Sequence, residues 1–233
     1  MGRVPGPRQA GAVRRLIVPA ADLLLGACCA GCGGPAMTLC RSCGTEMAPR
    51  PVLGTPSRRL AVPSVAGGVN AGVLRRVVVA WKEQGVTALT GVLDHHLAAA
   101  VVPLTTPGRP VVLVPVPTSR RSRRVRGCDL VDDLARAAAR RLRRTGVDVA
   151  VRQELACVHE TRDQSGLGAD ARWQNLEGAF GARGRPGTDD VDVVVIDDIL
   201  TTGATVSEAL RVLAAVGRGP VGVAVVATTP RRS

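Results

Sequence analysis

Apolar residues occur in short blocks along the second half of the chain, separated by polar or glycine-containing turns. Four blocks have the length and β-branched content of buried strands, and they lie near residues 111, 148, 193 and 221. Continuous apolar runs of this kind are typical of strands covered on both faces of a parallel sheet. The pattern therefore predicts a doubly wound α/β fold with a mainly parallel sheet.

Helical spacing accounts for the segments around these strands. Apolar positions three or four residues apart begin at Val73, Val86 and Val206, and Gly85 separates the first two of these helices. A further helix is expected to begin near Asp129, because its acidic first turn and arginine-rich last turn complement the helix dipole.

The apolar block that begins at Val193 is followed by two adjacent carboxylates, Asp197 and Asp198, at the expected carboxyl end of a strand. Open α/β sheets bind their ligands at this edge, and carboxylates accept hydrogen bonds from sugar hydroxyls. A hydroxyl-rich turn comes next and leads into a helix: Thr201, Thr202, Gly203, Ala204 and Thr205. Such a turn at a helix start predicts a phosphate site, and hence a site for ribose 5-phosphate. The alternative is an ordinary buried strand followed by a polar helix start.

This segment resembles the phosphoribosyl pyrophosphate (PRPP) signature of type I phosphoribosyltransferases. The resemblance implies that Asp197 and Asp198 hold the ribose hydroxyls and that the turn 201–205 holds the 5-phosphate. It also implies Mg²⁺, which we expect to be held mostly by the oxygens of PRPP rather than by a protein cage.

The formal net charge of +12 comes almost entirely from arginine. Five arginines follow the strand near 111 and the sequence Pro115-Val116-Pro117: Arg120, Arg121, Arg123, Arg124 and Arg126. An arginine loop at a strand's carboxyl end fits a polyanion, either the pyrophosphate of a substrate or a nucleic-acid backbone. We expect Arg120, Arg124 and Arg126 to bind pyrophosphate. The low aromatic content of 1% argues against stacking of single-stranded nucleic acid.

Two further features complete the expected catalytic set. Lys82, the single lysine, is predicted at a helix C-terminus, where it either complements the helix dipole or binds phosphate. The long polar segment 157–175 is predicted to be a mobile lid, which would bring Arg162 and Gln164 over the reacting centre.

The N-terminal region contains two closely spaced cysteine pairs: Cys29, Cys32, Cys40 and Cys43. Four thiolates with this spacing predict a structural Zn²⁺ site, in a segment too short to build its own core. Two disulfides are the rival interpretation, and Cys28 could replace Cys29 as a ligand.

These patterns divide the chain into four parts. We expect a disordered basic arm over residues 1–20, a zinc ribbon over 21–48, a Pro-rich connector without regular structure over 49–64, and the main domain over 65–230. A lipoprotein cleavage box ending at Cys28 is a weaker interpretation of the start, because Pro19 and Asp22 interrupt its apolar core. No run approaches the ~18 apolar residues that a membrane span needs, so we predict a cytoplasmic protein without a span.

The order of these features resembles that of the ComF family, an amidophosphoribosyltransferase-like group named for competence and DNA uptake. The resemblance extends roughly over residues 20–228 and depends on these features: the cysteine pairs, Lys82, Pro115-Val116-Pro117, Arg126-Gly127, Arg162-x-Gln164, Arg172-x2-Asn175 and the PRPP signature. After Arg-Gly the family usually has an aromatic residue and Asn, whereas this chain has Cys128 and Asp129. The resemblance implies a phosphoribosyltransferase with an unidentified acceptor. Its alternative is a non-catalytic accessory that binds single-stranded DNA or DNA-uptake proteins.

Overall fold

The computed structural model describes residues 28–56, 60–118, 127–158, 176–183 and 190–230. The chain divides into two compact units, residues 1–47 and residues 48–233. The first is a small cysteine-rich unit, and the second is an α/β domain.

The cysteine-rich unit contains the helix α2 (Arg41–Glu46) and a tight turn before it. Gly33 has a φ of +77° in this turn, and its N–H donates to the carbonyl of Cys29 at 2.8 Å. Among the residues of this unit that the structure describes, the buried apolar side chains are Cys29, Cys43 and Met47. So small a core does not stabilise a fold by hydrophobic burial alone.

The α/β domain has a six-stranded sheet with the order β1-β2-β8-β7-β3-β4. Its strands are β1 (Val52–Leu53), β2 (Ser64–Ala66), β3 (Val111–Pro115), β4 (Val149–Val151), β7 (Asp192–Leu200) and β8 (Pro220–Thr228). Every neighbouring pair is parallel except β1 and β2, which are antiparallel. The predicted mainly parallel sheet is therefore confirmed.

Two strands lie where the sequence pattern predicted none. Val52 and Leu53 form β1 within the Pro-rich stretch 49–64, and Ser64 begins β2, which pairs in parallel with β8. Both strands are too short for hydrophobic periodicity to show, and Leu53 is exposed. The expected connector is thus partly an edge of the sheet.

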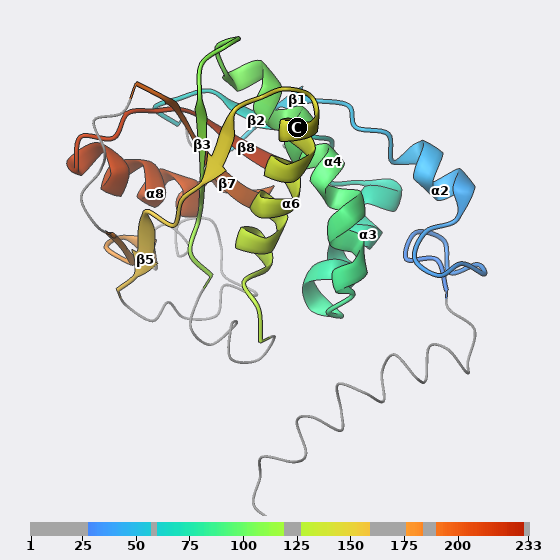
Figure 1. Ribbon diagram of the computed structural model, residues 1–233. Helices are drawn as coiled ribbons and strands as arrows, with labels where there is room; N and C mark the ends of the chain where they lie inside the picture. The colour runs from blue at the N-terminus through green and yellow to red at the C-terminus, as the bar shows by residue number, and fades with distance from the viewer. Residues whose placement is uncertain (1–27, 57–59, 119–126, 159–175, 184–189, 231–233) are drawn as a thin grey trace, which may run out of the picture. The chain divides into compact units, whose positions relative to one another are not determined.

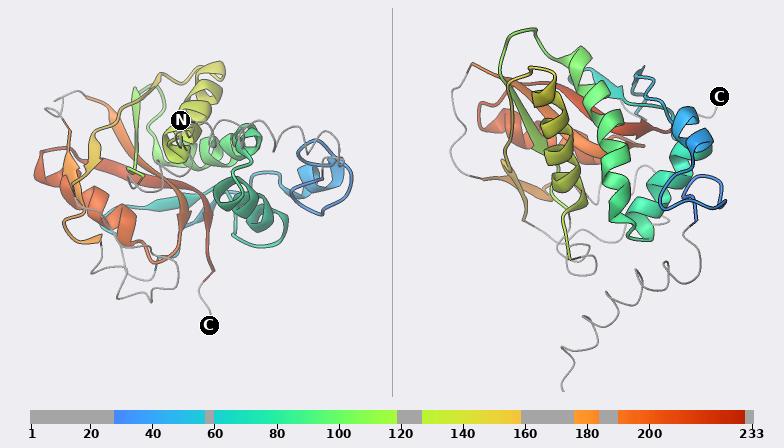
Figure 2. Two further views of the ribbon diagram at one scale, coloured as in Figure 1. Left: turned by 90° about the horizontal axis from the view of Figure 1, so that it is seen from below. Right: turned by 45° about the vertical axis from the view of Figure 1, so that its right-hand side comes forward.

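Helices cover both faces of the sheet, as a doubly wound fold requires. They are α3 (Gly72–Glu83), α4 (Thr90–Val101), α6 (Leu130–Arg144) and α8 (Ala204–Ala215), with 3-10 turns η1 (Thr87–Leu89) and η2 (Val102–Leu104) on either side of α4. Helices α4 and α6 lie on one face and α8 on the other (Figures 1 and 2). The predicted break at Gly85, which has a φ of +73°, separates α3 from η1.

A second, two-stranded antiparallel sheet joins β5 (Leu155–Cys157) to β6 (Phe180–Ala182). Both strands contact α8. The predicted lid was expected to begin at Cys157, which instead pairs with Phe180 at the end of β5. Residues 159–175 of that segment lie outside the described residues.

One helical stretch, Thr87–Leu104, is long and apolar enough to cross a membrane by length and composition alone. In the structure its main helix α4 packs against α6 and β8, and Leu93 and Leu97 are fully buried. The interior position of α4 accounts for its apolar composition.

Candidate functional site

Strand β7 carries two acidic residues past the end of its neighbour β3. Pro115, the last residue of β3, pairs with Ile196, whereas β7 continues to Leu200 beside β8. The sequence pattern placed Asp197 and Asp198 at the carboxyl end of the strand; they lie within its last four residues and are 8% and 6% exposed. The strand extends further than its apolar run because β8 continues to pair with it. The two carboxylates are therefore held on a rigid element at the open edge of the sheet.

Each carboxylate accepts a hydrogen bond from the backbone N–H of the next residue. The Asp198 N–H donates to Asp197 Oδ1 at 2.8 Å, and the Ile199 N–H donates to Asp198 Oδ1 at 2.7 Å. The other oxygen of Asp198, Oδ2, lies 2.6 Å from Lys82 Nζ. A carboxylate oxygen can accept two hydrogen bonds, so both oxygens of Asp198 keep unused acceptor capacity.

Burial favours the protonated form of Asp197. Burial raises the pKa of Asp197 to about 8, and the negative charge of Asp198 adds to this effect, whereas Lys82 opposes it. The same ion pair raises the pKa of Lys82, chiefly through the charge of Asp198. Beside Asp197, Lys82 and Asp198 form an ion pair.

The turn after β7 contains a glycine that no other residue could replace without strain. Gly203 has a φ of +84°, and a Cβ at this position would lie 2.8 Å from Pro56 Cβ. Gly203 is the N-cap of α8 and provides no side-chain hydrogen bond to it. Thr202 Oγ1 accepts from the Ala204 N–H at 3.3 Å. The first turn of α8 thus begins with backbone N–H groups beside threonine hydroxyls, as helix starts that accept an anion do.

Lys82 lies at the end of a helix, and its side chain contacts the acid pair. Lys82 is in the last turn of α3, as predicted, and its charge is paired with Asp198. The other predicted catalytic and pyrophosphate-binding residues lie outside the described residues: Arg120, Arg124, Arg126, Arg162 and Gln164.

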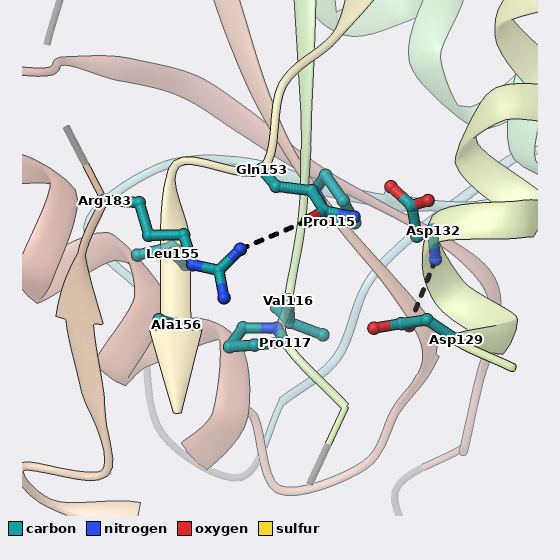
Figure 3. Close-up of a pocket in the computed structure, with 9 residues that line it drawn as sticks. All are labelled: Pro115, Val116, Pro117, Asp129, Asp132, Gln153, Leu155, Ala156 and Arg183. Atoms are coloured by element: carbon teal, nitrogen blue, oxygen red, sulfur yellow. Dashed lines mark hydrogen bonds between the residues drawn. The ribbon is translucent and has the colours of Figure 1, made fainter. Parts of the chain in front are cut away.

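A hollow lies at the carboxyl end of β3. Its lining consists of Pro115, Val116, Pro117, Asp129, Asp132, Gln153, Leu155, Ala156 and Arg183. Figure 3 shows Arg183 and Gln153 on one side, the acids of α6 on the other and the end of β3 between them. The hollow therefore borders the residues that lead from β3 into the arginine loop.

Asp129 has a structural role at the edge of this hollow. Its carboxylate accepts from the Asp132 N–H at 3.4 Å, which caps α6, and from Thr118 Oγ1 at 2.7 Å. Thr118 directly precedes the arginine loop. Asp129 thus caps α6 and binds the hydroxyl of Thr118.

Sequence reasoning missed a polar group at the carboxyl ends of β2 and β8. The Thr55 N–H donates to Thr228 Oγ1 at 3.3 Å, and Asn70 Nδ2 donates to Thr229 Oγ1 at 3.5 Å. Asn70 Oδ1 is buried and has no hydrogen-bond partner among the described residues. The contributing segments are separated by more than a hundred residues in the sequence, so local patterns could not reveal the group.

The four cysteines of the first unit lie together. The sulfur atoms of Cys29, Cys32, Cys40 and Cys43 all lie within 4.8 Å of one another, and those of Cys32 and Cys40 are 3.7 Å apart. Tetrahedral Zn²⁺ with Zn–S bonds of about 2.3 Å places its sulfurs roughly 3.8 Å apart. The donor set therefore fits zinc, and it includes Cys29 rather than Cys28.

Backbone donors make one of these thiols acidic. N–H groups of Cys40 and Gly31 lie 3.3 Å and 3.4 Å from Cys29 Sγ, and such hydrogen bonds, above all that of Cys40, lower the pKa of Cys29 to about 6. Burial instead raises the pKa of Cys43 to about 12. A cation at the centre would favour the thiolate of Cys43.

Comparison with known families supports the fold. Residues 122–233 match the family model described as the phosphoribosyl transferase domain, and this range includes the acid pair, the Gly203 turn and α8. A search of curated proteins found no match. With its mostly parallel sheet and flanking helices, the second unit has an α/β phosphoribosyltransferase fold, and the first has a cysteine cluster suited to a zinc ribbon.

Proposed function

From the phosphoribosyltransferase fold, we propose that the protein binds PRPP or ribose 5-phosphate at the carboxyl end of β7. The supporting observation is the buried pair Asp197 and Asp198, followed directly by the Gly203 turn at the start of the twelve-residue helix α8. The acids hold the ribose hydroxyls, and residues 201–205 hold the 5-phosphate through backbone N–H groups and hydroxyls.

The protonation of the acid pair suits two vicinal hydroxyls. Asp198, which is paired with Lys82, accepts a hydrogen bond from one hydroxyl. Asp197 is protonated at neutral pH, since burial raises its pKa, and it can donate to the other hydroxyl. The site thus presents both an acceptor and a donor to the sugar.

Transfer of the phosphoribosyl group breaks the bond from the anomeric carbon to a pyrophosphate oxygen and forms a bond to the acceptor. Positive charge develops at the anomeric carbon, and the ionised Asp198 favours this charge electrostatically. Arg120, Arg124 and Arg126 bind the departing pyrophosphate, while Arg162 and Gln164 close over the reacting centre and exclude water.

Mg²⁺ accompanies PRPP in this proposal and supplies charge neutralisation on the pyrophosphate. The acid pair does not form a protein cage for it, because Asp198 is paired with Lys82 and Asp197 holds a proton at neutral pH. The metal is therefore held mostly by substrate oxygens, with the arginines sharing the remaining negative charge.

The order of the strands suggests the side from which an acceptor enters. Strand β3, which leads into the arginine loop, lies on one side of β7, while β8 and β2 lie on the other. An acceptor that displaces pyrophosphate in line must approach from the side opposite the leaving group. That side carries the hydroxyls of Thr228 and Thr229 and the buried Oδ1 of Asn70, so the acceptor is expected to offer a hydrogen-bond donor.

Calorimetry tests the binding proposal. We expect PRPP with Mg²⁺, and ribose 5-phosphate alone, to bind the wild-type protein. Replacing both Asp197 and Asp198 by Asn should weaken binding at least tenfold, because the charged hydrogen bond of Asp198 contributes about 1.5–3 kcal/mol. Asp148→Asn, which removes an exposed carboxylate before β4, is the matched control. Absence of binding by the wild-type protein, or full binding by the double variant, would refute the proposal.

Pyrophosphate release tests turnover. PRPP and Mg²⁺ are incubated with a panel of nucleobases and amines, and released pyrophosphate is measured. An acceptor-dependent signal that disappears in Asp198→Asn identifies the acceptor class. Binding without release for every acceptor would leave the protein a PRPP-binding protein rather than a transferase.

We also propose that the first unit binds one structural Zn²⁺ ion through Cys29, Cys32, Cys40 and Cys43. The support is the four-thiol cluster with sulfurs within 4.8 Å. Metal analysis of purified protein should give one zinc per chain, and Cys43→Ser should lose it, whereas Cys28→Ser should keep it. A zinc content unchanged by Cys43→Ser would contradict this assignment.

The alternative of a DNA-binding accessory has no comparable support. The arginine loop that motivated it lies outside the described residues, and residues 122–233 match a phosphoribosyl transferase domain. Single-stranded DNA and DNA-uptake proteins therefore remain predictions from the family resemblance alone.

A further inference from the structure

Lys82 contacts the proposed ribose site through a single oxygen. Its Nζ lies 2.6 Å from Asp198 Oδ2, whereas Asp198 Oδ1 accepts from the Ile199 N–H. The lysine side chain is 35% exposed and the Asp198 side chain 9% exposed. The pair is therefore open to solvent on the lysine side and buried on the aspartate side.

Helix α3 fixes the position of the lysine. Val77, Val78 and Trp81 are almost completely buried, and Trp81 Nε1 donates to Thr90 Oγ1 at the start of α4 with a length of 2.9 Å. Because Trp81 precedes Lys82, the backbone of Lys82 is anchored. The lysine stem then extends from a fixed point to the end of β7, 116 positions later in the sequence.

The choice of residue at this position is informative. Of the chain's 31 Lys and Arg residues, Lys82 is the single lysine and the other 30 are arginines. An arginine binds a carboxylate with two parallel N–H groups and covers both oxygens, whereas an ammonium is a compact point charge. At Asp198 the ammonium uses one lone pair of Oδ2 and leaves further acceptor positions for a ligand.

We propose that Lys82 is a positioning residue of the ribose site, which orients Asp198 through one oxygen and leaves its remaining lone pairs to the sugar hydroxyls. The inference rests on the proposed function of that site. It differs from a role in stabilising α3, because an arginine would complement the helix dipole equally well but would cover the carboxylate.

Binding of ribose 5-phosphate, measured by calorimetry, tests the proposal with three variants. Lys82→Met removes the charge that orients Asp198, and Lys82→Arg keeps the charge but covers both oxygens. Arg75→Met is the matched control, because it removes an exposed cation from the same helix. We expect both Lys82 variants to raise the Kd about tenfold or more, a change of about 1.4 kcal/mol, and Arg75→Met to change it less than twofold.

A double-mutant cycle shows whether Lys82 acts through Asp198. In the Asp198→Asn background, Lys82→Met should have no further effect on the Kd. Additive losses, or wild-type affinity in Lys82→Arg, would overturn the inference while the proposed function stands. If the wild-type protein binds no sugar phosphate, the proposed function fails and the inference fails with it.

The single lysine permits a second readout that needs no ligand. Protein labelled with ¹⁵N-lysine gives one side-chain signal, whose pH titration reports the pKa of Lys82. Because the charge of Asp198 raises that pKa, the titration should move to lower pH in Asp198→Asn. An unchanged titration would show that the two groups do not interact in solution, which would overturn the inference.

Discussion

Buried charged groups at the two ends of strands β7 and β8 differ in how many protein partners they have. At the amino end, Asp192 accepts from the Thr106 N–H at 2.6 Å and is ion-paired with Arg109 at 3.0 Å. Arg218, which is 4% exposed, binds both oxygens of Glu154 at 2.6 and 3.0 Å. Both carboxylates at this end are thus paired with an arginine, while Arg109 Nε, 3.0 Å from Asp192, makes no hydrogen bond among the described residues.

At the carboxyl end the polar groups have fewer partners. Asp197 is buried beside a second carboxylate, Asp198 has one ammonium on one oxygen, and Asn70 Oδ1 lacks a hydrogen-bond partner among the described residues. Buried polar groups are normally paired, so an end of the sheet with spare donors and acceptors is suited to a ligand. The amino end stabilises the fold, and the carboxyl end retains capacity for binding.

The largest loss of stability is expected at the amino end, where we predict a purely structural role for the ion pair of Arg218 and Glu154. Arg218→Met removes the buried partner of Glu154, whose side chain is only 13% exposed, so we expect it to lower the free energy of unfolding by about 3–5 kcal/mol. Ribose 5-phosphate affinity of the folded protein should not change. Urea unfolding measures the loss, with Arg144→Met, at the exposed end of α6, as the control that loses at most about 1 kcal/mol. If Arg218→Met and Arg144→Met lowered the free energy of unfolding equally, the amino end would have no special structural role.

The next largest loss of stability is expected at two glycines, one at each end of α8. Gly203 and Gly217 have φ values of +84° and +77°, but only at Gly203 would a Cβ meet other atoms, Pro56 Cβ at 2.8 Å. Both alanine variants incur backbone strain of about 1–3 kcal/mol. Gly203→Ala should cost more than Gly217→Ala in urea unfolding and should alone weaken ribose 5-phosphate binding. Equal binding by the two variants would exclude the Gly203 turn from the phosphate site.

The sequence was sufficient to predict the central part of this fold. The apolar runs at Val111 and Val193 each form a buried strand with the expected parallel pairing, because a continuous run of β-branched residues has few other stable environments. Strands β1 and β2 were not predicted, since two- and three-residue strands carry no periodic signal. Their pairing depends on β8, more than 150 residues away.

The candidate site was predictable only in its local part. Asp197, Asp198 and the turn to Thr205 are consecutive, so their types and order indicate a ribose-phosphate site. The pairing of Lys82 with Asp198 depends on the placement of α3 beside β7, which no local pattern determines. The sequence also could not reveal that burial would raise the pKa of Asp197.

The titration of Asp197 should make the stability of the protein depend on pH. In the folded state the pKa of Asp197 is raised to about 8, whereas an unfolded Asp titrates near about 3.9. Between these values the folded protein keeps a proton that the unfolded chain has lost. The contribution of Asp197 to stability is therefore present at low pH and declines as the pH rises towards 8, by up to about 1.4 kcal/mol per pH unit.

Asp197→Asn removes this dependence, because an amide remains neutral and its oxygen can still accept from the Asp198 N–H. Urea unfolding of both proteins at pH 5, 6, 7 and 8 isolates the contribution of Asp197, since every other titrating group, the cysteines included, is common to the two. We expect the variant to be less stable than, or equal to, the wild type at pH 5 and to gain relative to it with each step. Parallel curves would mean that Asp197 is ionised in the folded state. The carboxyl end of β7 would then hold two charged acids, and the contrast with the amino end would rest on Lys82 and Asn70 alone.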